Sequence, residues 1–293
     1  MSTTTAHDRS RVRAVRRFAD VGWKYPLAAV MIFYSAFPLV YVLSASVADG
    51  GTLTGSTSLF RSFSTANFEA LGATRFWTWG GNSLVIGTVT AVGSVLMGAA
   101  AAYAFSRFRF AGRRAGLLSL MVIQMFPQML AFVSIFLLLL ALGQVVPALG
   151  LNSKVALVAV YLGGALGSNT FLMYGFFNTV PRELDEAAKI DGATHAQTYW
   201  TIILRLVTPI LAVVGLLSFI TTFGEFIIAR LVLTSESNWT LAVGMYGWVS
   251  QQLNANWGIF AAGSVIAAVP VLLLFLSLQR YIVGGLTAGS VKG

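Results

Sequence analysis

The chain has 293 residues, of which 57% are hydrophobic and 10% are charged, whereas soluble domains carry about 45–50% apolar and about 25% charged residues. This composition excludes an ordinary soluble domain and predicts an integral membrane protein. The apolar runs are continuous, so we expect an all-α fold, because the strands of a membrane barrel alternate apolar and polar residues. The sequence has no cysteine and only two histidines, which excludes disulfides, thiolate metal sites and a histidine cluster.

The apolar runs predict six transmembrane helices of about 20 residues each. Their expected boundaries, in chain order, are Leu27–Val47, Ser83–Phe105, Leu117–Leu142, Val155–Phe177, Leu206–Leu233 and Ile259–Leu278. Residues 1–24 form a basic N-terminal segment, residues 25–280 form the membrane domain, and residues 281–293 form a C-terminal tail. The first run begins too late and is too long for a cleaved signal peptide, so we expect a retained helix.

The net charge of +9 suggests nucleic acid at first sight, but the positions of the basic residues indicate membrane topology instead. With a cytoplasmic N-terminus, six spans return the C-terminus to the cytoplasm. Lys and Arg then number 15 on the inside against 4 on the outside, which are Arg61, Arg75, Lys154 and Arg230. This bias is typical of membrane proteins. It predicts a multi-pass protein in contact with membrane lipid, with both termini cytoplasmic and no nucleic-acid partner.

A few polar residues within the apolar spans are candidates for a translocation pathway. Gln124 and Gln128 flank a proline in the third span, where proline removes a backbone hydrogen bond and bends the helix. Asn169 lies in the fourth span. Such amides either line a pathway or bond a neighbouring helix, and both alternatives stay open. Glu225 and Arg230, near the outer end of the fifth span, either face a cavity or form an interfacial ion pair.

The polar segment between the fourth and fifth spans, residues 178–205, has the pattern of a short helix. Pro181 suits a first helical turn, and the acids Glu183, Asp185 and Glu186 follow where the helix dipole favours negative charge. Asp185 and Lys189 are four residues apart, which predicts an ion pair along the helix.

The same segment predicts a small apolar face and a hinge. Leu184, Ala187 and Ala188 share one face of the helix, and its alanines would let the helix seat deeply in a groove on another protein. Gly192 is placed to end the helix in a left-handed conformation. The pair Thr194–Gln197 then fits a capping box for a second helix that leads into the fifth span. The alternative is an ordinary charged loop held by its own ion pairs.

Glu186-Ala187-Ala188, then Gly192, then Ile202-Ile203-Leu204 ahead of Thr208-Pro209 resembles the EAA motif of binding-protein-dependent ABC importer permeases. In that family the segment is a coupling helix that docks into a cleft on an ATPase subunit. The resemblance implies an ATPase-coupling site, with Glu186 touching the ATPase and Gly192 providing the turn. Its implied members are Glu186, Ala187, Ala188, Asp191 and Gly192. Where the family often has Leu-Pro, this chain has Leu204-Arg205.

The resemblance covers nearly the whole chain and is greatest to the smaller permease subunits of maltose-type importers. It is carried by Ala101–Arg107, Gln124–Pro127, Ala159–Gly164, Leu241–Met245 and Gly285–Gly293. It implies the type I ABC importer permease fold, with six transmembrane helices and a cytoplasmic coupling helix, in a bacterial or archaeal cell membrane.

The resemblance further implies a non-catalytic subunit that works with a second homologous permease, two ATPase subunits and an extracytoplasmic sugar-binding protein. ATP and Mg would be held by the ATPase subunits, and this chain would bind no cofactor. In agreement, the sequence has neither a Gly-x-x-x-x-Gly-Lys-Ser/Thr loop nor a His-Glu-x-x-His motif.

Two further contact segments are implied by the family. The tail would contact the ATPase subunits, through Gly289, Ser290, Val291, Lys292 and Gly293, although its composition alone predicts disorder. An outer loop would enter the cleft of the sugar-binding protein, through Gln251, Gln252, Asn254 and Asn256. Amide side chains suit that role because they can compete for the hydrogen bonds of sugar hydroxyls.

The expected function is ATP-driven sugar import of the maltose, maltodextrin or trehalose type, with another oligosaccharide or a polyol as a more distant alternative. A different class of function is a secondary carrier or channel that moves a small polar solute without an ATPase. That alternative needs an ion or proton site within the membrane, and Glu225 is the one candidate acid inside an expected span.

Overall fold

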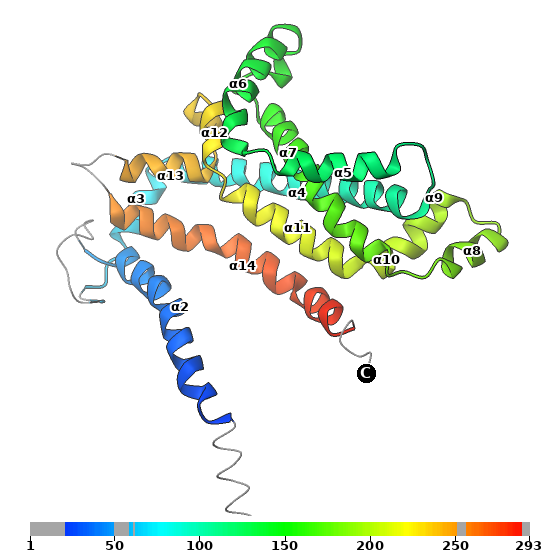
Figure 1. Cartoon of the computed structure of the whole chain (residues 1–293). Coiled ribbons are helices and arrows are strands. Elements are labelled where there is room, and N and C mark those ends of the chain that lie inside the picture. Colours follow the sequence, from blue (N-terminus) through cyan, green and yellow to red (C-terminus); the bar gives the residue numbers. More distant parts are fainter. Residues whose placement is uncertain (1–20, 50–58, 61, 251–255, 289–293) are drawn as a thin grey trace, which may run out of the picture. The chain divides into compact units, whose positions relative to one another are not determined.

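A computed structural model describes residues 21–49, 59–60, 62–250 and 256–288 of the chain. All regular elements in these residues are helical, which confirms the expected all-α class. The chain divides into two compact units, Met1–Ala70 with Asn256–Val265 and Leu71–Ala255 with Ile266–Gly293, and each is described by itself (Figure 1).

The smaller unit is organised around the buried side chain of Asn67. The first long helix, α2 (Lys24–Ser46), exposes most of its apolar side chains and ends beside α3 (Ala66–Gly72). The amide of Asn67 donates hydrogen bonds to the backbone oxygens of Ser46 at 3.1 Å and Ala48 at 2.9 Å. A Cβ at Gly258 would lie 2.5 Å from the Asn67 Oδ1, so a glycine is needed where α14 (Trp257–Ala288) begins.

The larger unit is built on three long helices, α4 (Phe76–Arg107), α7 (Lys154–Phe177) and α11 (Thr208–Phe223). Small residues allow the backbones of these helices to approach closely, as expected for helices in a membrane. A Cβ at Gly93 of α4 would lie 2.8 Å from Leu162 Cδ2 of α7, and one at Gly98 would lie 3.3 Å from Met173 Sδ. Gly93 and Gly98 of α4 therefore serve helix packing.

The third expected span, Leu117–Leu142, is two helices instead of one kinked helix. α5 (Arg113–Gln124) ends before Met125, and α6 (Gln128–Val145) begins after Pro127. The backbone of Pro127 is extended, with φ −60° and ψ 113°. A proline also disfavours the helical conformation of the residue before it, so the chain breaks at this point. A single 3-10 turn, η1 (Pro147–Leu149), follows α6.

The fifth expected span, Leu206–Leu233, is also interrupted. α10 (Leu204–Leu206) precedes α11, and the helical axis bends by 79° between His195–Leu206 and Thr208–Phe223. A second interruption at Gly224 separates α11 from α12 (Ile227–Val232). Continuous helices were expected at both points, and that expectation was wrong.

Four helices in the described residues are long and apolar enough to cross a membrane: α2, α4, α7 and the first 26 residues of α14, Trp257–Ile282. The number is five if the bent pair that contains α11 is counted as one span, and the apolar part of α6 is shorter, at Leu130–Val145. The sixth span therefore remains a prediction, because the third expected span is divided into α5 and α6.

The start of α4 holds the segment after α12 through polar contacts. This segment comprises η3 (Glu236–Asn238) and α13 (Leu241–Val249). Trp79 donates to the backbone oxygen of Glu236 at 3.0 Å, and the amide of Asn82 donates to that of Trp239 at 2.8 Å. A Cβ at Gly244 of α13 would collide with the Trp79 ring. This end of α4 is therefore closely packed.

Glu225 is part of this packing. Its carboxylate accepts hydrogen bonds from the backbone of Ile228 at 2.8 Å and Ala229 at 2.9 Å, and so caps the start of α12. The hydroxyl of Tyr161 donates to the same carboxylate at 2.5 Å. Arg230 instead lies over the ring of Trp239, 5.2 Å from its centroid. Across the described residues, Glu225 and Arg230 form no ion pair with each other.

Candidate functional site

The candidate site is α8 (Glu183–Ile190), a short helix between α7 and α9 (His195–Gln197), at the opposite end of α4 from α13 (Figure 1). Its first turn carries Glu183, Asp185 and Glu186, as the sequence predicts. Gly192 has a φ of +80°, and the N–H of Ala193 bonds the carbonyl of Ala188 at 2.9 Å. The expected left-handed glycine therefore ends α8.

The expected capping box follows the glycine. The Thr194 side chain accepts from the Gln197 N–H at 3.2 Å, and the Gln197 side chain accepts from the Thr194 N–H at 2.8 Å. The next residues form a π-helix, η2 (Thr198–Ile203), which the sequence analysis missed. Thr198 and Thr201 donate their hydroxyls to carbonyls one turn back, at 3.1 and 2.7 Å, a contact that competes with regular helical bonds. The two threonines, three residues apart, were the feature of the sequence that could have indicated an irregular helix here.

Arg107, the last residue of α4, ties α8 to the helical core. Its Nε lies 2.8 Å from Asp185 Oδ2, and the two side chains are only 6% and 20% exposed. These two atoms are in ion-pair contact but lack the alignment of a hydrogen bond. The remaining guanidinium nitrogens donate to the backbone oxygens of Phe177 at 3.2 Å and Val180 at 3.0 Å. One side chain thus joins the ends of α4, α7 and α8.

This contact corrects the expectation that Asp185 pairs with Lys189 along α8. Among the residues that the structure describes, Lys189 takes part in no ion pair, and it is exposed. Asp185 turns toward Arg107 because a buried guanidinium needs a compensating charge. The excess of basic residues on the inner side accounts for Arg107 only as a topological charge and gives no sign of this contact.

A second set of contacts, beside that of Arg107, also fastens the start of α8 to α4. Arg182 donates to the backbone oxygen of Ser106 at 3.0 Å. The Ser106 hydroxyl donates to Asn178 Oδ1 at 2.9 Å, and Ser106 is fully buried. The start of α8 is therefore held to α4 from two directions.

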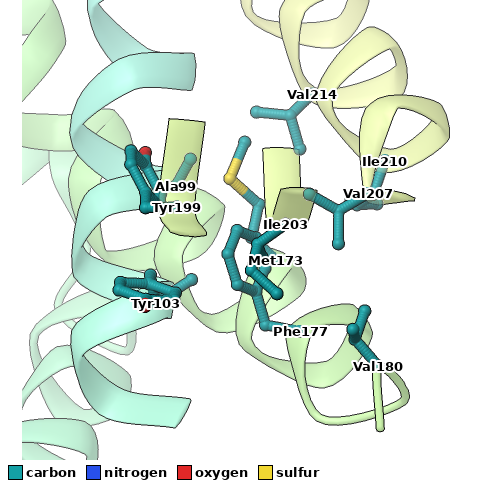
Figure 2. Close-up of a cluster of buried hydrophobic side chains, with 11 residues drawn as sticks. Ala99, Tyr103, Met173, Phe177, Val180, Tyr199, Ile203, Val207, Ile210 and Val214 are labelled. Atoms are coloured by element: carbon teal, nitrogen blue, oxygen red, sulfur yellow. The ribbon is translucent and has the colours of Figure 1, made fainter. Parts of the chain in front are cut away.

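A continuous apolar cluster joins η2 to α4, α7 and α11 (Figure 2). Met173, Phe177 and Ile203 are fully buried in it. Tyr103 of α4 packs on Tyr199 of η2, with ring centroids 4.9 Å apart. Close-packed interiors transmit displacement because they have little free volume, so this cluster couples the position of η2 to those of α4, α7 and α11.

The outward surface of α8 differs from the predicted face. Ala188 is 5% exposed and packs inward, whereas Leu184 is 37% exposed and Ala187 is also exposed. Glu186, Asp191 and Gly192 are exposed, and Ile190 is 86% exposed. The expected continuous face of Leu184, Ala187 and Ala188 is therefore divided. The accessible surface combines acids with a protruding isoleucine.

The pathway candidates are only partly placed by the structure. Asn169 donates from Nδ2 to Ser218 Oγ at 3.1 Å and so joins α7 to α11, and its place in a pathway stays a prediction. Gln124 ends α5 and lies against Gly167 of α7, where a Cβ would be 2.5 Å from its Nε2. The Gln128 side chain is outside the described residues.

The two other predicted contact segments are mostly outside the described residues. This is the case for Gln251, Gln252 and Asn254 of the outer loop, and for Gly289, Ser290, Val291, Lys292 and Gly293 of the tail. Asn256 is described, and its carbonyl accepts from the Phe260 N–H at 3.0 Å in the first turn of α14. α14 continues to Ala288, ten residues beyond its expected end at Leu278. In the described part of the chain, no cluster of His, Asp or Glu suits a metal ion.

Comparison with known proteins identifies the family. Residues 94–287 match the binding-protein-dependent transport system inner membrane component family. The chain is 40% identical to the maltose/maltodextrin transport system permease protein MalG of Vibrio parahaemolyticus, over 88% of this chain and 90% of that protein. It is 36% identical to the galactooligosaccharides transport system permease protein GanQ of Bacillus subtilis, over 95% of this chain and 98% of that protein.

The fold agrees with this match. A chain of a solved bacterial ABC transporter, described as importing the polysaccharide alginate, superposes with a TM-score of 0.75 at 22% identity. The match covers 96% of this chain and 99% of the solved one. The expected ABC importer permease fold is thereby confirmed. The chain belongs to the binding-protein-dependent transport system inner membrane component family and is a multi-pass membrane permease subunit.

Proposed function

We propose that this chain is one of two permease subunits in an ATP-driven, binding-protein-dependent sugar importer, and that α8 receives the motion of an ATPase subunit. One observation carries the proposal: α8 presents exposed Glu186, Asp191 and Ile190 while Arg107 fastens its first turn to α4. A surface with a protruding apolar side chain suits a protein partner. A rigid attachment suits the transfer of force.

The complete importer would contain this chain, a second homologous permease, two ATPase subunits and an extracytoplasmic sugar-binding protein. ATP and Mg would reside in the ATPase subunits. Closure of the ATPase dimer on ATP would displace α8, and the contacts of Arg107 and Arg182 would pass that displacement to α4. The helices of the two permeases would then rock between inward- and outward-facing arrangements.

The proposed orientation places α8 and both chain termini in the cytoplasm of a bacterial or archaeal cell. It rests on the excess of Lys and Arg on that side. The coupling surface would consist of Glu186, Ala187, Asp191 and Gly192, and Ala188 would contribute by seating α8 inward. The tail Gly289–Gly293 would add a second ATPase contact, and the loop with Gln251, Gln252, Asn254 and Asn256 would meet the sugar-binding protein.

The proposed substrate is an oligosaccharide of the maltose or maltodextrin type. This choice rests on the similarity to MalG, a permease of maltose/maltodextrin transport. GanQ, a permease of galactooligosaccharide transport, is similar to this chain at nearly the same identity. The comparisons therefore support an oligosaccharide substrate more strongly than they support a particular sugar or glycosidic linkage. Trehalose remains within the same class. Purified complex, supplied with each sugar and its binding protein, would hydrolyse ATP fastest with the true substrate.

The carrier or channel alternative has less support. It needs a membrane acid that is available for ions or protons, and Glu225 already accepts from two backbone N–H groups and from Tyr161. A carboxylate satisfied in this way acts as a helix cap.

The proposal is tested by reversing the charge on the coupling surface. We expect Glu186→Lys to abolish sugar uptake in cells and to weaken co-purification of the ATPase subunit, while the permease stays folded. Glu69→Lys is the matched control, because Glu69 is also exposed but lies on α3. Sugar uptake that persists after deletion of the ATPase genes would show that the chain is not an importer subunit.

A further inference from the structure

A basic pocket of about 590 Å³ opens beside the turn between α4 and α5. Three arginines line it, Arg109, Arg113 and Arg114, together with Phe110 and Tyr174. Its residues belong to the turn itself and to α5 and α7. None of them has a part in the function proposed above.

Backbone geometry and one anchored side chain build this pocket. Gly112 has a φ of +84° and reverses the chain just before α5 begins. Arg113 is then fixed from two sides, because its Nε donates to the backbone oxygen of Phe105 at 2.6 Å and its Nη2 donates to the Tyr174 hydroxyl at 3.1 Å. The guanidinium of Arg113 is thereby held in place before any ligand arrives.

The positive charge of the pocket is uncompensated. Of the arginines in the described part of the chain, Arg75 and Arg107 have carboxylate partners. For Arg109, Arg113 and Arg114, no described carboxylate lies within ion-pair distance. Three like charges in six residues repel one another, and the free N–H groups at the start of α5 add partial positive charge. An anion with several oxygens would relieve this repulsion and accept bidentate hydrogen bonds from the guanidinium groups.

An apolar strip continues from the pocket along α5. Leu118 and Val122 follow Arg114 at intervals of four residues, so all three lie on one face of the helix. Leu118 is 52% exposed and Val122 is 64% exposed, and the neighbouring Met121 is 45% exposed. A small water-soluble anion would use the arginines alone. A phosphate group attached to a hydrocarbon chain would use both the arginines and this strip.

We propose that this pocket binds an anionic phospholipid. The phosphodiester lies among Arg109, Arg113 and Arg114, with the Tyr174 hydroxyl at its edge, and one acyl chain lies along Leu118 and Val122. Basic pockets at the membrane interface suit such headgroups, and each nearby basic residue contributes about fivefold in affinity. The site would make the subunit sensitive to the anionic lipid content of the membrane around it.

The test is lipid retention by the purified importer complex. After delipidation in detergent, the complex is titrated with phosphatidylglycerol or phosphatidylcholine and the bound lipid is counted by native mass spectrometry. We expect Arg109→Gln/Arg114→Gln to weaken binding of phosphatidylglycerol at one site by about thirtyfold, since two basic residues are removed. Arg109→Lys/Arg114→Lys, which keeps both charges, should restore most of the loss. Arg113 is left intact because it also holds α4 and α7 together.

The control Arg205→Gln/Arg280→Gln removes two exposed arginines that do not line the pocket, and it should bind phosphatidylglycerol as the wild type does. An unchanged thermal unfolding midpoint in the pocket variant shows that it is folded. Equal binding of phosphatidylglycerol by the wild type and the pocket variant would overturn the proposal. So would equal affinity for phosphatidylcholine, or full displacement of the lipid by glycerol 3-phosphate, which has the phosphate without the acyl chains.

Discussion

Arg107 Nε and Asp185 Oδ2 lie 2.8 Å apart at the junction of α4 and α8, and both side chains are largely buried. The two residues are 78 positions apart in sequence, so their contact is a tertiary one that links a long membrane helix to the short helix we propose for coupling. Because the same guanidinium also donates to the carbonyls of Phe177 and Val180, its loss would remove several contacts among the ends of α4, α7 and α8 at once.

We predict that Arg107→Gln impairs coupling and stability together. The change leaves the Asp185 carboxylate and two carbonyl groups without their partner. Removal of one member of a buried ion pair lowers the free energy of unfolding by about 3–5 kcal/mol. Asp185 retains 20% exposure, so we expect the lower end of that range. The thermal unfolding midpoint of the complex and its sugar-stimulated ATP hydrolysis should both fall. Lys189→Gln, on the exposed side of α8, should change neither the unfolding midpoint nor the spacing of α8 from α4.

Gly192 should tolerate asparagine better than alanine. Its φ of +80° is left-handed, which costs an ordinary residue about 1–2 kcal/mol, whereas asparagine visits this region readily. We expect sugar uptake to decrease in the order Gly192, Gly192→Asn, Gly192→Ala. Gly175→Ala provides the comparison, since a Cβ there meets nothing within 4 Å. Equal uptake by the alanine and asparagine variants would argue against a required left-handed turn.

Gly244→Ala should destabilise the packing at the start of α4. The added Cβ would collide with the ring of Trp79, which is 4% exposed and hydrogen-bonded to Glu236. Overpacking of this kind costs about 1–3 kcal/mol. Gly247→Ala lies on the same helix in open space and should be neutral. Thermal unfolding of the two variants measures the difference, and equal midpoints would contradict the described packing.

Asn169 and Ser218 should behave as a coupled pair. Removal of one partner of their 3.1 Å hydrogen bond is expected to cost about 0.6 kcal/mol, the usual size of such contacts between membrane helices. In a double-mutant cycle, Asn169→Ala and Ser218→Ala together should cost little more than either change alone. Asn169→Ala could instead change the apparent sugar affinity by the same factor in the wild type and in Ser218→Ala. In that case Asn169 lines the pathway and does not act through Ser218.

The sequence was most informative where local rules decide the structure. Acidic residues at a helix start, Gly192 at its end and the Thr194–Gln197 capping box all depend on neighbours within four positions, and all three features were predicted. A bend was predicted at Pro127, but the complete breaks at Pro127 and Gly224 were not, because apolar composition does not separate a kinked or continuous span from two shorter helices.

The contacts of the candidate site were harder to predict. Asp185 has a favourable partner in Lys189 four residues away, and only the tertiary fold shows that Arg107 takes that place. The inward position of Ala188 has the same origin, since periodicity defines a shared face but does not say which part of it the rest of the chain covers. The pocket at Arg109, Arg113 and Arg114 likewise required the fold, which brings Tyr174 beside them.

The central claim, that α8 is the docking surface for an ATPase subunit, is tested most directly by site-specific photo-crosslinking in the assembled importer. A photoreactive phenylalanine analogue replaces Ile190, which is 86% exposed on α8, and in a control it replaces Trp77, which is 62% exposed at the other end of α4. We predict a covalent adduct with the ATPase subunit from position 190 and none from position 77. An adduct from position 77 with none from position 190 would contradict the claim.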